Sequence, residues 1–136
     1  MLLILFDPDI LVVFIDWVFI EGQGSLLNPG STASLPLLRG SCATHMILCH
    51  RADFLALRDY KHIIIPDLNE VIKLYESLAS ACGIYPKAKV IGISLNTFKL
   101  DSFEAKKAVD SLESLTNLPV TDVIRYGPEK LGLAIN

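Results

Sequence analysis

The sequence contains no low-complexity tract and little glycine or proline, with eight and seven residues respectively in a chain of 136. Hydrophobic residues make up 51% of the chain and charged residues 20%. Disordered chains are poor in apolar residues and collagen needs glycine at every third position, so both classes are excluded. A chain of this length is typical of one domain, and it can bury a hydrophobic core without disulfides or metals.

Basic residues and cysteines are also few. Twelve Lys and Arg residues are scattered among fifteen Asp and Glu residues, for a formal charge of −3. Binding to phosphate backbones depends on clustered cations, so we expect no nucleic-acid partner. The three cysteines are an odd number at irregular spacings, which favours a reducing compartment. We therefore expect a cytoplasmic protein.

The first twenty residues are strongly apolar, but acidic residues interrupt them at Asp7, Asp9 and Asp16. A carboxylate near the centre of a bilayer is costly, no cation precedes the stretch, and no small-residue cleavage site follows it. We expect neither a membrane segment nor a secretory signal. The continuous apolar run at 16–20 instead predicts a buried strand of a parallel sheet. For residues 1–15 the pattern defines no element.

Short apolar runs alternate with amphipathic segments in the rest of the chain. The expected elements are strands at 17–20, 46–49, 89–95 and 120–124, the last at a sheet edge, and helices at 67–82 and 102–116. Both helix starts carry an acidic N-cap followed three residues later by glutamate, Asp67 with Glu70 and Asp101 with Glu104. Strands that alternate with helices of this length predict an α/β fold with a parallel sheet.

Two of the expected strands lead into loops that are candidates for binding, since ligands of open parallel sheets bind at the carboxyl ends of strands. The first loop is EGQGS, Glu21 to Ser25, and the second begins at Asn96. The two glycines of the first loop allow its backbone to pass close to a ligand. Glu21 places a carboxylate at the tip of a strand, where it can hold Mg²⁺ beside a phosphate. The alternative is a tight turn in which Glu21 caps the next element. A Rossmann fingerprint is excluded because Leu27 replaces the third glycine, and no Walker A Gly-Lys-Ser or Gly-Lys-Thr occurs.

Cysteine and histidine occur close together at Cys42, His45, Cys49 and His50. These residue types bind zinc, but no second ligand pair follows, and adjacent residues on a strand point to opposite faces. Cys49 and His50 also have the residue types of a nucleophile and its base. Neighbouring side chains on a strand do not readily hydrogen-bond, however, so we expect Cys49 to lie in the core.

Five motifs that follow one another along the chain resemble a single protein family. They are DWVFIEGQGSLLNP, LCH, IPDLNEVIKLYE, VIGISLNTFKL and LPVTDVIRYGPEKL. Together they are similar to the carboxyl-terminal part of a P-loop family, at least one branch of which is described as D-glutamate N-acetyltransferase. The resemblance covers about Asp16 to Ile135. It implies a partial, three-layer P-loop NTPase-like domain with a parallel sheet over 16–136, and it leaves 1–15 outside.

The resemblance also implies a nucleotide site. The family's P-loop domain is similar to dethiobiotin synthetase, whose corresponding strand ends in a Glu-Gly-x-Gly loop. By this resemblance Glu21 would bind Mg²⁺ and Asn96 would hydrogen-bond a nucleotide base. The residues that would line the phosphate or substrate side are Gly22, Gln23, Gly24 and Ser25. ATP or GTP with Mg²⁺ is the implied ligand.

Two further residues match the family's motifs. His50 belongs to LCH and is the candidate catalytic residue. Arg125 matches a basic residue near the family's carboxyl terminus and would bind an anionic substrate; the alternative is a solvated surface arginine. Acetyl-CoA as acyl donor and a small amino acid as acceptor are the partners that the resemblance implies.

The family's Walker A loop and upstream domain have no counterpart in this sequence, so we expect a fragment or truncated gene product. One hypothesis is part of an enzyme that transfers an acyl group to the amine of an amino acid and is inactive alone. The other is a non-catalytic α/β remnant that acts as a binding or interaction module. Loss of the strand that leads into a P-loop would expose a sheet edge, through which we expect self-association.

Overall fold

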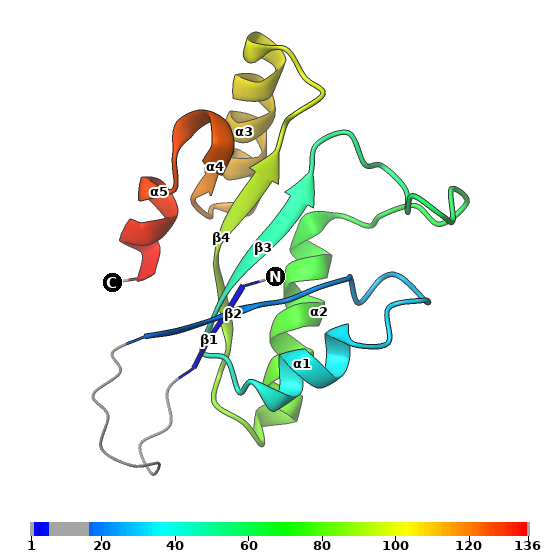
Figure 1. The fold of residues 1–136 in the computed structure, drawn as a ribbon, viewed down its shortest axis with the longest axis vertical. Helices are drawn as coiled ribbons and strands as arrows, with labels where there is room; N and C mark the ends of the chain where they lie inside the picture. The colour runs from blue at the N-terminus through cyan, green and yellow to red at the C-terminus, as the bar shows by residue number, and fades with distance from the viewer. Residues whose placement is uncertain (1, 6–16, 136) are drawn as a thin grey trace. The chain divides into compact units, whose positions relative to one another are not determined.

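A computed structural model describes residues 2–5 and 17–135 of the chain (Figure 1). The strands are β1 (Leu2–Leu5), β2 (Val18–Glu21), β3 (His45–Arg51), β4 (Lys89–Asn96) and β5 (Val120–Thr121). The α-helices are α1 (Ser34–Gly40), α2 (Leu68–Ser80), α3 (Ser102–Thr116), α4 (Val123–Tyr126) and α5 (Glu129–Gly132). Two 3₁₀ turns follow α2 and α5, at Ala81–Gly83 and Leu133–Ile135.

The strands form one sheet in the order β2-β1-β3-β4-β5. Strands β4 and β5 are parallel, with Ile93 opposite Val120. The α/β class is therefore confirmed, and so is parallel pairing at β4 and β5. The prediction of a buried parallel strand at 16–20 was wrong, because β2 is antiparallel to its neighbour and alternates half-buried with exposed residues. Strand β1 was not predicted: it pairs antiparallel with β2, Leu2 opposite Glu21. Four apolar residues are too few to show a strand's periodicity, which explains why the pattern at 1–15 indicated no element.

The described residues divide into two compact units, which are treated separately below. Unit 1 comprises 1–46 and 72–90, and unit 2 comprises 47–71 and 91–136. In unit 1, the core includes Leu38 of α1 and Tyr75 of α2, both buried. Glu76 of α2 accepts hydrogen bonds from the Val90 amide and the Lys89 ammonium at 3.0 and 3.2 Å, so the helix is fastened to the start of β4.

In unit 2, helix α3 begins and ends as the sequence chemistry dictates. The Asp101 carboxylate accepts from the Glu104 amide at 2.8 Å and the Glu104 carboxylate accepts from the Asp101 amide at 3.2 Å, which confirms the predicted capping box. Asn117 ends the helix in the left-handed conformation, φ +54°, and its amide donates to the carbonyl of Glu113. The face of α3 that carries Ala105 and Val109 is buried.

Gly92 of β4 allows close packing in unit 2. A Cβ at this position would lie 2.6 Å from Leu131 Cδ2 and 3.2 Å from the backbone oxygen of Pro119. Leu131, on α5, is itself buried. Glycine at 92 is therefore what lets α5 pack directly against the backbone of the strand.

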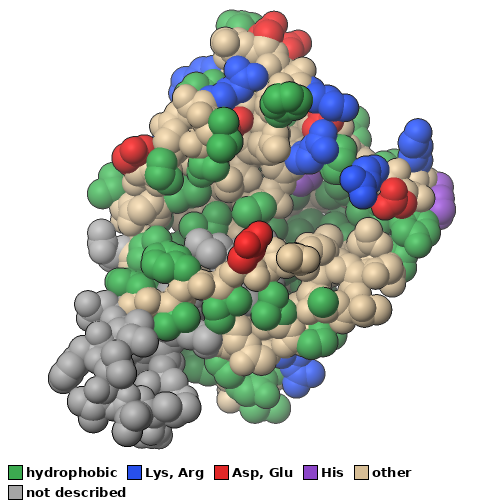
Figure 2. Space-filling model, in the orientation of Figure 1, with side chains coloured by type: hydrophobic (Ala, Val, Ile, Leu, Met, Phe, Trp, Pro, Cys, Tyr) green, Lys and Arg blue, Asp and Glu red, His purple; other side chains and the backbone are tan. Residues whose placement is uncertain are grey.

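Large apolar side chains remain exposed in unit 2 at Phe98, Phe103 and Ile124, which are 82%, 78% and 90% exposed. Figure 2 shows hydrophobic side chains among polar ones on the face that it presents. Single exposed apolar residues are common on folded proteins. Self-association through a sheet edge stays a prediction.

Asp122 links three segments of unit 2. It is buried, 4% exposed, and Oδ1 accepts from the amides of Ile124 and Arg125 at 3.0 and 3.2 Å, which caps α4. Oδ2 accepts from the amide of Thr97 at 2.9 Å and from its hydroxyl. Burial alone would raise the pKa of Asp122, but the hydrogen bonds from Thr97, Arg125 and Ile124 outweigh it and hold the pKa below its ordinary value.

We expect Asp122→Asn to lower the free energy of unfolding at pH 7 by about 1–3 kcal/mol, because a buried charged acceptor is lost. A carboxylate with a lowered pKa stabilises the fold above its unfolded pKa of about 3.9, and this contribution disappears as the pH falls through the folded-state pKa. The difference in the free energy of unfolding between wild type and variant, measured by urea unfolding, should therefore become smaller at acid pH. Asp110→Asn, at an exposed Lys106–Asp110 pair, is the matched control with a change below about 0.5 kcal/mol.

Candidate functional site

The EGQGS loop lies in unit 1 and begins where β2 ends. Glu21 is the last residue of the strand and is exposed, not buried against a cation. Gly24 has φ +77°, and a Cβ there would collide with the hydroxyl of Ser31 and lie 2.8 Å from that of Ser34. Buried Ser34, the first residue of α1, donates to the carbonyl of Gln23 at 2.9 Å and also hydrogen-bonds the Ser31 hydroxyl. Gly24 thus lets the loop fold tightly against the start of α1.

Three successive amides, at the last residue of this loop and the two residues after it, are already engaged by side chains. The Ser25 amide donates to Ser31 Oγ at 3.3 Å, the Leu26 amide to Tyr75 Oη at 3.2 Å, and the Leu27 amide to Ser25 Oγ at 3.2 Å. A phosphate-binding loop needs convergent amides that are open to the ligand. The hydrogen bonds of this loop therefore favour the alternative given above, a tight turn, over a phosphate-binding loop.

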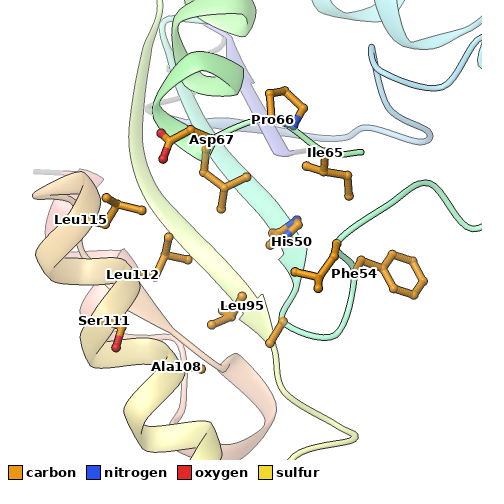
Figure 3. A pocket seen from close by; sticks show the side chains of 13 residues that line it. His50, Phe54, Ile65, Pro66, Asp67, Leu95, Ala108, Ser111, Leu112 and Leu115 are labelled. Carbon is orange, nitrogen blue, oxygen red and sulfur yellow. The ribbon is translucent and has the colours of Figure 1, made fainter. Parts of the chain in front are cut away.

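A pocket of about 370 Å³ lies in unit 2 (Figure 3). Its walls come from the end of β3, the segment that leads into α2, strand β4 and one face of α3. The lining residues are His50, Ala52, Phe54, Leu55, Ile65, Pro66, Asp67, Leu68, Leu95, Ala108, Ser111, Leu112 and Leu115. Of the residues singled out from the sequence for a role at the site, only His50 lines this pocket. Ten of the thirteen side chains are apolar, so the pocket favours an apolar ligand.

The segment between β3 and α2 folds back on itself to build this wall. Ala56 and Ile64 form an antiparallel bridge, and the Ile65 amide donates to the carbonyl of Leu55 at 3.0 Å. The Asn69 side chain donates to the carbonyl of Leu115 at 3.3 Å, which joins the first turn of α2 to the last turn of α3. The sequence did not lead us to predict this pocket. The apolar residues Phe54, Leu55 and Ile65, in a segment without helix or strand, were the signal that could have indicated it.

His50 is half-buried near the end of β3. Removal of water by burial lowers the pKa of His50, while the negative charge of Asp53 acts in the opposite direction and is the smaller effect. Asp53 is itself held by Arg51, whose Nη2 lies 2.8 Å from Oδ2. The imidazole is consequently uncharged at neutral pH, a form in which it can accept a proton.

Cys49 is exposed, so the prediction that it lies in the core was wrong. The buried part of β3 is Met46 to Leu48, and the burial of the strand ends before Cys49.

Within residues 2–5 and 17–135 no group of three or more Cys, His, Asp or Glu side chains is placed to hold a metal ion. Nor is any helix of the described part long and apolar enough to cross a membrane.

Asn96 and Arg125 also belong to unit 2. Asn96 is the last residue of β4; its carbonyl accepts from the Ala52 amide at 3.0 Å and its Oδ1 from the Phe98 amide at 2.9 Å. What its side chain can offer a ligand is therefore the amide N–H groups. Arg125 Nη2 donates to the carbonyls of Leu100 and Thr97 at 2.6 and 3.3 Å. Arg125 thus stabilises the loop that follows β4. This role is neither of the two predicted from the sequence, which were binding of an anionic substrate and a solvated surface arginine.

These residues fall into two sets. Glu21 and the loop from Gly22 to Ser25 lie in unit 1, whereas His50, Asn96 and Arg125 lie in unit 2. A nucleotide site shared by both sets stays a prediction. Each of Glu21, His50 and Asn96 does lie within the last two residues of its strand, where a ligand of an α/β sheet is expected.

The comparison with known families decides what the five motifs indicate. A model described as a domain of unknown function, the DUF1611_C P-loop domain, matches residues 12–132. The chain belongs to the DUF1611 family. A crystal structure of a DUF1611 family protein from Anabaena variabilis ATCC 29413 is 50% identical with a TM-score of 0.82, over 85% of this chain and 34% of that one. The resemblance and the fold class predicted from the sequence are both confirmed.

Two curated relatives of this DUF1611 domain carry the name D-glutamate N-acetyltransferase. The one from a Pseudoalteromonas species is 31% identical over 116 residues, and the one from Tritonibacter scottomollicae is 32% identical over 116 residues. Each match covers 85% of this chain and 34% of the relative, so the chain spans about a third of the length of these proteins.

We expect Gly24→Ala to lower the free energy of unfolding by about 1–3 kcal/mol, because the added Cβ collides with Ser31 and the positive φ is unfavourable for alanine. Gly30→Ala is the control in the same loop: its nearest neighbour to a new Cβ is Asn28 Oδ1 at 3.4 Å, an ordinary contact. Urea unfolding of the two variants measures the difference. Equal stability of both would contradict the packing described for Gly24.

We expect an NMR titration of His50 to have its midpoint below about 6.5, the value of an unburied imidazole. Because the folded-state pKa is the lower one, the unfolded chain binds the proton first, and stability falls as the pH drops through about 6.5 and levels off below the folded-state pKa. His50→Gln should weaken this loss of stability in urea unfolding between pH 8 and pH 5. A midpoint at or above 6.5 would show that burial does not control this histidine.

Proposed function

We propose that this DUF1611 domain is part of an amino-acid N-acyltransferase, an enzyme that transfers an acyl group to the amine of a small amino acid. The observation that supports this most is the 31–32% identity, over 116 residues, to two proteins named D-glutamate N-acetyltransferase. Acetyl-CoA is the corresponding donor and D-glutamate the first acceptor to test. The proposal concerns the activity of a whole protein, of which this chain is equivalent to about a third.

His50 is the residue that would act on the reacting amine. An amine must give up a proton to become an amide, and a neutral imidazole beside the substrate can accept it. The lowered pKa of His50 keeps the imidazole in that neutral form, and its position at the pocket gives a substrate access to it. Arg125 is a weaker candidate for binding the acceptor's carboxylates, because two backbone carbonyls already occupy Nη2.

Nucleotide binding is the less well supported part of the proposal. Glu21 could ligate Mg²⁺ beside a nucleotide phosphate, since Mg²⁺ often binds proteins through one carboxylate and the phosphates themselves. The amides of Ser25, Leu26 and Leu27, however, are engaged by side chains, and the sequence has no Walker A motif. Without a bound cation, Glu21 would also repel a phosphate.

We expect the 136-residue chain to bind ATP or GTP with Mg²⁺ only in the millimolar range, about −4 kcal/mol, because side chains already engage the amides of Ser25, Leu26 and Leu27 and the sequence has no Walker A motif. Calorimetry with each nucleotide, with and without Mg²⁺, measures the affinity. Glu21→Gln should abolish any dependence on Mg²⁺, whereas Glu129→Gln, at an exposed carboxylate of unit 2, should leave it unchanged. Micromolar binding would show that the loop opens to accept phosphate.

The acyltransferase proposal is tested best in a chimera. The matched 116-residue segment of the Pseudoalteromonas enzyme is replaced by that of this chain, and N-acetyl-D-glutamate and free CoA are measured. We expect activity in the chimera and a fall in kcat of about 10²–10⁴ for His50→Ala, typical of the loss of a general base. His62→Ala, at an exposed histidine of the segment between β3 and α2, is the control and should retain activity.

The chimera also separates the two hypotheses for the chain. Its thermal unfolding, compared with that of the parent enzyme, shows whether it folds. A folded chimera without activity would favour the non-catalytic binding module. A chimera in which His50→Ala and His62→Ala are equally active would remove His50 from the mechanism while leaving the family's activity in place.

A further inference from the structure

The pocket of unit 2 is larger than an acetyl group requires. At roughly 30 Å³ for each water-sized group, its volume of about 370 Å³ holds on the order of twelve such groups, whereas an acetyl group has three non-hydrogen atoms. The volume also falls within the range of about 300–1,000 Å³ that small-molecule sites occupy. The pocket therefore has room for a ligand considerably longer than the acyl group in the names of the curated relatives.

We propose that this pocket binds an aliphatic acyl chain of about six to ten carbons, attached through an uncharged carbonyl group such as an amide or thioester. This inference rests on the residues of the pocket and holds whether or not the acyltransferase activity is confirmed. In Figure 3 the apolar side chains of Leu95, Leu112 and Leu115 come from β4 and α3, and those of Ile65 and Phe54 come from the segment before α2. An alkyl chain would contact apolar atoms on both sides.

The scarcity of polar partners argues for an alkyl chain over a chain that contains amides, such as the pantetheine arm of CoA. Only His50, Asp67 and Ser111 contribute polar side chains to the lining. One oxygen of the Asp67 carboxylate, Oδ1, already accepts from the Asn69 amide at 2.8 Å. Buried amide groups that find no partner weaken binding, whereas methylene groups need none.

The charges of the lining argue for an uncharged carbonyl over a free carboxylate. Asp67 contributes a carboxylate, and the imidazole of His50 is neutral because burial lowers its pKa. Arg51, whose guanidinium lies 4.0 Å from the Phe54 ring, pairs with Asp53 through two hydrogen bonds of 3.1 and 2.8 Å, and Lys99 lies 3.6 Å from the same carboxylate. A fatty-acid carboxylate would therefore meet repulsion without compensation, while a neutral His50 can donate its ring N–H to a carbonyl oxygen.

The test uses the 136-residue chain and a series of straight-chain primary amides with two, four, six and eight carbons. Calorimetry, or chemical shift changes of His50 where affinity is low, gives the dissociation constants. Each added methylene should tighten binding about fourfold, equivalent to about 0.8 kcal/mol, until the pocket is full. Octanoate should bind more weakly than octanamide at the same pH. An affinity that does not change with chain length, or tighter binding of octanoate, would overturn the proposal.

A pair of variants on α3 locates the binding. Ala108 lines the pocket, and Ala108→Leu fills part of it, so octanamide should bind at least tenfold more weakly while acetamide changes little. Lys107→Leu adds the same side chain at the neighbouring exposed position, outside the pocket, and should leave the series unchanged. Circular dichroism confirms that both variants fold. Equal affinity of octanamide for the two variants would place the alkyl chain elsewhere and refute the assignment.

Discussion

One buried carboxylate, Asp122, maintains the carboxyl end of β4 in unit 2. Asp122 accepts hydrogen bonds from two segments that are far apart in sequence, Thr97 and the first turn of α4. Helix α3 and strand β5 lie between these segments along the chain. A buried ionised group is favourable only when it is fully hydrogen-bonded, and here four donors satisfy it. Arg125 of the same turn then reaches the carbonyls of Thr97 and Leu100. The loop after Asn96 has its shape because these donors and acceptors meet around one carboxylate.

The sequence predicted local structure correctly where interactions between residues close in sequence determine it. The capping box of Asp101 and Glu104 and the apolar spacing of α2 and α3 depend on contacts within one or two helical turns, and both helices were placed correctly to within a few residues. Strand β1 and the exposure of Cys49 could not be read in this way. Both depend on which segments distant in sequence cover a strand, and that information is not local.

The candidate site shows the same division. The sequence identified the glycine loop by its residue types and its position at the end of a strand, and it identified His50 through the family's LCH motif. It could not show that the amides of Ser25 to Leu27 are engaged by side chains, because one partner, Tyr75, lies 49 residues from Leu26. Nor could it show the apolar pocket, whose walls come from four separate segments of unit 2. Residue types indicate what chemistry is available, whereas tertiary contacts determine which groups remain open to a ligand.

The close packing at Gly92 limits which residues related chains can have at this position of β4. Because α5 packs against bare strand backbone, any other residue at 92 requires Leu131 and the chain at Pro119 to move together. A single substitution there cannot be absorbed by one flexible side chain, since one of the two obstacles is a backbone oxygen. Residues 92 and 131 should therefore change in concert among related chains, since a larger residue at 92 needs both a rearranged or smaller side chain at 131 and a shift of the chain at Pro119.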